Sequence, residues 1–113
     1  MGMILAPIAA DKLPIWTSFI DEVGGARKAE FDDFNRRHKL TRHEAWLCET
    51  PGGTMVCAIH EGPGADEMMP NVSKSTHSFD QWFAAKLHEI HGLDVSKGPP
   101  PGKPPVKKLG WTA

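Results

Sequence analysis

This 113-residue sequence has little cysteine, almost no excess of charge and no long apolar run. Its two cysteines, Cys48 and Cys57, lack the C-x-x-C spacing of zinc and redox motifs, so a disulfide framework or a zinc finger is not expected. A formal net charge of -1, with no basic cluster among the aromatic residues, argues against binding to nucleic acid. Because no apolar run approaches the ~20 residues that cross a bilayer, we expect no membrane span.

The start of the sequence also lacks the common targeting patterns. Residues 4–10 are apolar, but no Lys or Arg precedes them as in a secretory signal peptide. Ala6 stands where the N-myristoylation pattern requires Ser or Thr. We therefore expect a soluble cytoplasmic protein with one folded domain, residues 1–95, and an extended proline-rich C-terminal tail, residues 96–113.

The strongest helix signal lies in residues 78–91. Ser78 and Gln81 have the S-x-x-Q spacing of a capping box. Gly92 is suited to the left-handed residue that ends a helix, with Leu93 as its hydrophobic contact. The apolar residues between these ends recur at steps of three and four, which predicts one buried helical face made of Phe79, Trp82, Phe83, Leu87 and Ile90.

Earlier in the chain, residues 3–8 are predicted to form a strand, with Pro7 near its end or on an unpaired edge. Residues 11–38 have helical periodicity that is interrupted at Gly24-Gly25. This pattern fits one long helix with a weak joint, or two shorter helices. A further short helix is possible over residues 65–72.

The clearest hairpin joins residues 41–50 to residues 54–61 through Pro51-Gly52-Gly53. Alternation in both strands leaves two largely apolar faces, which is typical of a sheet covered on both sides. Two substantial helices are enough to cover one face. We therefore expect the second face to pack against another copy of the chain, as a homodimer.

The element order strand, helix, hairpin, helix, extended tail resembles the βαββα(β) order of the dimeric α+β barrel superfamily. It is particularly similar to small uncharacterised bacterial proteins with a Trp-Phe helix and a proline-rich tail. The residues that carry this resemblance are Phe79, Asp80, Trp82, Phe83, His91, Gly92, Asp94, Pro99, Pro100, Pro101 and Gly102. It implies an α+β fold in which a ferredoxin-like antiparallel sheet has helices on one face and forms a dimeric barrel. The superfamily includes monooxygenases, isomerases, cyclases and proteins without known activity, so it selects no reaction.

A candidate site follows from pairing Thr50 with Thr54 across a three-residue turn. This register places Glu44 opposite His60, as a possible catalytic acid/base pair. Trp46 would line a pocket for a small apolar or cyclic ligand, with His88 as a weaker additional candidate. The alternative is that Glu44 and His60 form only a structural cross-strand pair, and a shift of register by one residue would separate them.

The segment His88-Glu89-Ile90-His91 is one residue short of the H-E-x-x-H zinc motif, and no third ligand is indicated. We therefore expect no metal, haem or other cofactor. Two functions stay open, with a metal- or haem-binding protein as a third alternative behind them. The first is a small-molecule-binding protein or a cofactor-independent enzyme, similar to monooxygenases or isomerases. The second is a non-catalytic oligomeric module.

Overall fold

The computed structural model describes residues 2–97 and 105–113. Within these ranges, a three-stranded antiparallel sheet is combined with four α-helices and three short 3-10 helices. The strands are β1 (Gly2–Ile8), β2 (Arg42–Thr50) and β3 (Gly53–Glu61), and the α-helices are α1 (Leu13–Gly24), α2 (Lys28–Arg37), α3 (Met68–Lys74) and α4 (Ser78–His91). The 3-10 helices are η1 (Ala10–Lys12), η2 (Ala65–Glu67) and η3 (Val95–Lys97). None of the helices in the described ranges has the length and apolar character needed to cross a membrane.

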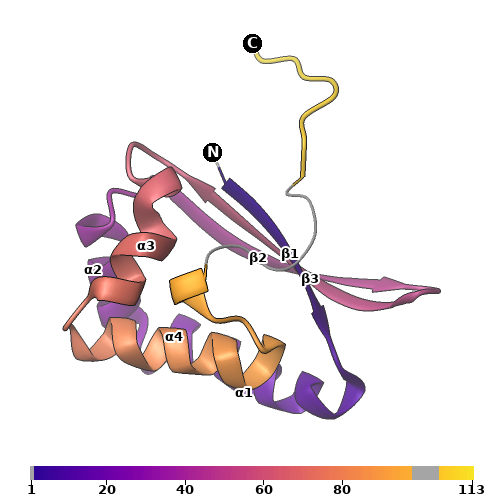
Figure 1. Ribbon diagram of the computed structural model, residues 1–113, viewed down its shortest axis with the longest axis horizontal. Helices are drawn as coiled ribbons and strands as arrows, with labels where there is room; N and C mark the ends of the chain where they lie inside the picture. The colour runs from indigo at the N-terminus through magenta and orange to yellow at the C-terminus, as the bar shows by residue number, and fades with distance from the viewer. Residues whose placement is uncertain (1, 98–104) are drawn as a thin grey trace.

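The strand order is β1-β3-β2, so β3 lies in the centre and both other strands are edges. Pro7 therefore lies in an edge strand, one residue before its end, as predicted. All four α-helices pack on one side of this sheet (Figure 1). The α+β class and the placement of helices on one face are thus confirmed.

The core lies between the sheet and the helices. Phe34 of α2 and Phe79 of α4 are completely buried, and their ring centres are 5.6 Å apart. The predicted apolar face of α4 is largely confirmed, because Phe79, Phe83 and Ile90 are buried. Trp82 is only half-buried, and the guanidinium of Arg27 lies 4.2 Å from its ring centre.

The glycine pair separates two helices rather than bending one. α1 ends at Gly24, and α2 begins at Lys28. The Arg27 N–H donates to the Glu22 carbonyl at 2.8 Å, so the last turn of α1 closes before the chain turns into α2. Of the two interpretations of residues 11–38, two shorter helices is the correct one.

The ends of α4 differ in how well sequence predicts them. Gly92 has φ 68°, and the Leu93 N–H donates to the Leu87 carbonyl at 3.4 Å, which is the predicted Schellman ending. The predicted cap at the other end is wrong, because Ser78 is the first helical residue. His77 takes the cap position, and its Nδ1 accepts a hydrogen bond from the Phe79 N–H at 3.2 Å.

The hairpin turn is one residue shorter than predicted. Thr50 pairs with Gly53 rather than Thr54, so only Pro51 and Gly52 lie between the strands. Every cross-strand pair therefore shifts by one residue. Glu44 lies opposite Ile59, and His60 lies opposite His43, so the predicted pairing of Glu44 with His60 is wrong.

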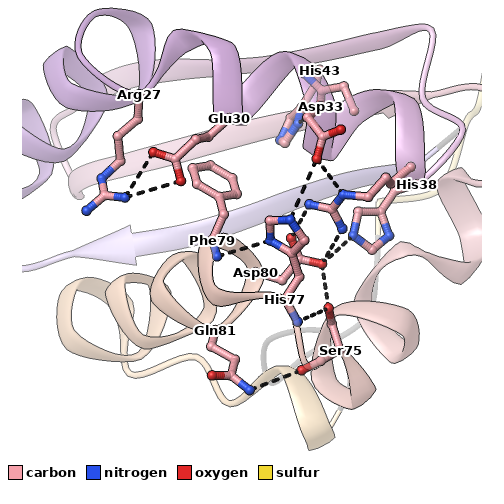
Figure 2. A network of polar contacts seen from close by, with 12 residues as sticks. Arg27, Glu30, Asp33, His38, His43, Ser75, His77, Phe79, Asp80 and Gln81 are labelled. Carbon is pink, nitrogen blue, oxygen red and sulfur yellow. Dashed lines mark hydrogen bonds and ion pairs between the residues drawn. The ribbon is translucent and has the colours of Figure 1, made fainter.

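A buried carboxylate joins the end of α2 to the start of α4 (Figure 2). Asp80 has no exposed surface, and it accepts hydrogen bonds from both terminal nitrogens of Arg37, at 2.9 and 2.8 Å. Its Oδ2 also lies 3.0 Å from His38 Nε2 and 2.7 Å from the Ser75 hydroxyl, which donates to it. Ser75 in turn accepts from the His77 N–H at 3.2 Å, so the linker before α4 belongs to the same network.

These hydrogen bonds determine the charge of Asp80. Burial alone would raise the pKa of the Asp80 carboxyl, but the bonds from Arg37, Ser75 and His38 hold its pKa well below the ordinary range. The carboxylate is therefore charged in the folded protein at neutral pH. The same pairing raises the pKa of the Arg37 guanidinium.

Residues 105–113 form an exposed, extended segment that leaves the rest of the chain (Figure 1). Val106, Leu109 and Trp111 in this segment are 67, 92 and 86 % exposed. The extended tail was predicted to begin at residue 96, but Ser96 and Lys97 belong to η3. Residues 98–104, which hold most of the tail's prolines, lie outside the described residues.

We predict that Asp80→Asn lowers the free energy of unfolding by about 3 kcal/mol at pH 7, because it removes one partner of a buried ion pair. The carboxyl has a depressed pKa in the folded state, so its contribution is present above the unfolded pKa of ~3.9 and is lost as pH falls through the folded pKa. The difference between variant and wild type should therefore shrink at pH 3. Urea unfolding at both pH values measures it.

Asp33→Asn is the matched control, because Asp33 also bonds Arg37, at 2.7 Å, but is half exposed. It should cost under ~1 kcal/mol. Equal losses in the two variants would contradict a dominant role for the buried carboxylate.

Candidate functional site

A cavity of about 230 Å³ lies between the inner face of the sheet and the helices. All three strands and all four α-helices described here contribute to its wall. Its lining is mostly apolar and includes Ile4, Ala6, Trp16, Phe19, Val56 and Phe83. Three imidazoles, those of His43, His60 and His91, interrupt this apolar surface. The cavity is thus a hydrophobic pocket with a few polar groups, which is the usual composition of a small-molecule site.

His43 and His60 face each other across β2 and β3. They form a directly opposed cross-strand pair, and their ring centres are 4.6 Å apart. His43 is held by aromatic neighbours on α2 and α4, with the rings of Phe31 and Phe83 at 4.9 and 6.0 Å. His60 is 97 % buried, since only 3 % of its surface is exposed.

The two imidazoles differ in their hydrogen bonds. His43 Nδ1 lies 2.8 Å from the amide oxygen of Asn35 on α2. Because that oxygen only accepts, His43 carries its proton on Nδ1 and keeps a lone pair on Nε2. His60 makes no side-chain hydrogen bond with any residue in the ranges 2–97 and 105–113. No fully buried side-chain nitrogen or oxygen in the described ranges lacks a partner, so the unpaired ring nitrogens of His60 are not sealed from solvent or the cavity. They can bond water or a ligand there.

Burial also fixes the charge of both rings. It lowers the pKa of His60 to about 4. It lowers the pKa of His43 to about 3, with further contributions from the neighbouring His60 and His38. Both imidazoles are therefore neutral at pH 7, and each offers one N–H donor and one acceptor nitrogen.

The structure separates the catalytic pair predicted from the sequence. His60 points to the inner, helix-covered face, whereas Glu44 follows the opposite parity of β2. Glu44 contributes to the wall of the cavity, but its carboxylate accepts hydrogen bonds from Arg42 at 2.9 Å and from the Trp46 indole at 3.0 Å. These two bonds lower the pKa of Glu44. Trp46 itself is 57 % exposed on the outer face and does not line the cavity.

The other predicted binding residue, His88, is exposed on α4 and lies outside the cavity. It lines a separate open groove between the hairpin turn and the end of α4, together with His91. His91 Nδ1 lies 3.2 Å from the Pro7 carbonyl and donates to it, which ties α4 to β1. Across residues 2–97 and 105–113 there is no group of three or more His, Cys, Asp or Glu side chains that could hold a metal ion.

His43 is the cavity residue that sequence reasoning missed. A signal for it was present, because a two-residue Pro-Gly turn would have placed His43, rather than Glu44, opposite His60. Asn35 gave no comparable signal, since its role depends on how α2 packs against the sheet.

Comparisons with known proteins give no identification: no family model matches the chain, and neither a curated protein nor a solved structure matches it.

We predict that the rings of His43 and His60 stay neutral down to about pH 5 in an NMR titration. Because the folded pKa values lie below the ordinary value near 6.5, the unfolded chain binds more protons as pH falls. The free energy of unfolding should therefore decrease between about pH 6.5 and pH 4, by up to about 1.4 kcal/mol per pH unit for each ring.

His60→Gln should reduce the pH dependence of the free energy of unfolding by the contribution of one imidazole. Glu44→Gln is the control and should leave the titration of His60 unchanged, because the two side chains follow opposite faces of the sheet. A clear shift of the His60 titration in Glu44→Gln would contradict the observed register.

Proposed function

We propose that this protein binds a small, mostly apolar, cyclic molecule in the cavity, and that His60 recognises a single polar group on it. The observation that carries this proposal is an imidazole, 97 % buried at the wall of an apolar cavity, whose ring nitrogens bond no described residue and are not sealed from the cavity or solvent. The donor and acceptor nitrogens of a neutral imidazole suit a hydroxyl or carbonyl group.

The size of the cavity sets the size of the ligand. A dry engineered cavity of about 150 Å³ accepts benzene, and drug-sized ligands occupy pockets of roughly 300–1,000 Å³. A volume of about 230 Å³ lies between these values. It therefore fits a substituted single ring better than a fused ring system or a chain.

The pKa of His60 favours binding over acid/base catalysis. A general base works best when its pKa lies near the operating pH. A pKa of about 4 is some three units below neutrality, so His60 is a weak base for removing a proton from a substrate. Such a ring still donates and accepts hydrogen bonds. A cofactor-independent monooxygenase or isomerase would need a bound substrate or a nearby charge to raise that pKa.

We further propose that the protein is a homodimer of the dimeric α+β barrel type. The strand order β1-β3-β2, with every neighbour antiparallel, is compatible with a ferredoxin-like half. Support for a partner comes from the outer face of the sheet. No helix in the described ranges covers it, and its side chains are largely apolar: Met3, Leu5, Pro7, Trp46, Cys48, Met55, Cys57 and Ile59.

Phenol and toluene provide a matched pair of probes, since they differ by one hydroxyl. In wild type we expect saturable shifts of cavity resonances with both compounds. In His60→Leu, phenol should bind about 2- to 13-fold more weakly relative to toluene, because one hydrogen bond contributes a net ~0.5–1.5 kcal/mol. NMR titration of the folded proteins gives the dissociation constants.

Glu49→Gln, at an exposed position of β2 outside the cavity wall, should leave the ratio of phenol to toluene affinity at its wild-type value. Failure of both probes to bind wild type, or an unchanged ratio in His60→Leu, would overturn the role assigned to His60.

The dimer is tested by sedimentation of wild type and Leu5→Lys at micromolar concentration. Leu5 is 42 % exposed on the outer face, so a charge there should disrupt a sheet-to-sheet interface without touching the core. We expect dimeric wild type and a dissociated variant. A monomeric wild type would exclude the barrel architecture.

A further inference from the structure

Residues 105–113 form what we call the arm, and it has an unusual composition for a free segment. Val106, Leu109 and Trp111 expose most of their apolar surface, and only Lys107 and Lys108 carry charge. The arm makes no side-chain hydrogen bond or ion pair with residues 2–97, and it runs away from them (Figure 1). Three large apolar side chains in nine residues are typical of a segment that docks on a surface.

The outer face of the sheet is a matching surface. Trp46 on the edge strand β2 is 57 % exposed, and Cys48 lies two residues further along on the same face. Leu5 and Met3 continue the apolar surface across β1. The arm and the outer face are thus two incompletely buried apolar surfaces on the same chain.

The area of the sheet indicates that the face alone is small for a dimer interface. β1 and β3 share seven residue pairs, which at ~3.4 Å per residue gives a length of about 24 Å. Three strands ~4.8 Å apart are about 14 Å wide, so two facing sheets contribute a planar area of only ~700 Å². Side-chain relief adds to this value, but standard interfaces bury ~1,200–2,000 Å². One Trp buries a further ~150–250 Å².

We propose that the arm of each protomer packs on the β2 side of the outer face of the second copy, against its Trp46 and Cys48. The dimer is thus closed by two exchanged arms. This inference rests on the proposed dimer.

The course of the chain favours the second copy over the arm's own sheet. Val95 is buried in the core on the helix side of the sheet, whereas the outer face lies on the opposite side. The eight Cα–Cα steps from Lys97 to Pro105 span at most about 29 Å. A path around the edge of its own sheet crosses two packing layers of ~10 Å each, which uses about 20 Å of that reach before the arm begins.

Site-directed cross-linking tests the proposal on the full chain. Leu109→Cys is combined with Cys57→Ser, so that Cys48 is the remaining native thiol, and a short bismaleimide is added to the folded protein. We expect a covalent dimer whose linked peptides contain positions 109 and 48. Adding Cys48→Ser should abolish that product. Any covalent dimer that still forms in this variant would come from a link between the two copies of position 109. Lys28→Cys, on the exposed start of α2, replaces Leu109→Cys in the matched control and should give no such product.

The outcomes separate the arm from the dimer. A link between positions 109 and 48 within one chain, or no link in a protein that sediments as a dimer, would overturn the arm exchange and leave the dimer intact. A monomeric wild type would overturn both. As a second measurement, Trp111→Ala should raise the dimer dissociation constant at least about tenfold, as expected for a buried aromatic anchor. The fold of each protomer should be unaffected, because Trp111 is 86 % exposed.

Discussion

The fold depends on keeping one carboxylate charged inside the protein. Asp80 is completely buried, and an uncompensated charge there would cost several kcal/mol. Its compensation comes from Arg37 and His38 at the end of α2 and from Ser75 in the linker before α4. Three segments must therefore be in place together for the charge to be compensated. An apolar contact tolerates small displacements, whereas a bidentate Arg–carboxylate pair allows one relative orientation of α2 and α4.

The same constraint extends to the cavity through α2. The helix that ends in Arg37 and His38 also carries Asn35, whose amide oxygen selects the tautomer of His43. It carries Phe31 as well, which packs against the His43 ring and contributes to the cavity wall. A shift of α2 would move these side chains together. The ionic network around Asp80 thus takes no part in the cavity itself, but it holds α2, the helix that shapes one of the cavity walls.

The elements with a local signature were predictable, and those fixed by tertiary packing were not. The apolar face of α4 and its Gly92 ending follow from spacing along a single helix. Asp80 and Arg37 are 43 residues apart, and no short-range pattern connects them. The hairpin register failed for a different reason. With apolar residues on both faces, alternation cannot show which face is buried, and the choice between a two- and a three-residue turn decides it.

The short Pro51-Gly52 turn also makes this hairpin sensitive to changes that most loops tolerate. Surface loops usually accept an inserted residue at little cost. If one residue were inserted here, β2 could absorb it by shifting its register with β3 by one residue. That shift would turn the side chains of β2 to the opposite face of the sheet. Glu44 and Trp46 would then face the helices, and His43 would leave the cavity. Natural length variation at this turn should therefore be rare, or be accompanied by exchanged residue types along β2.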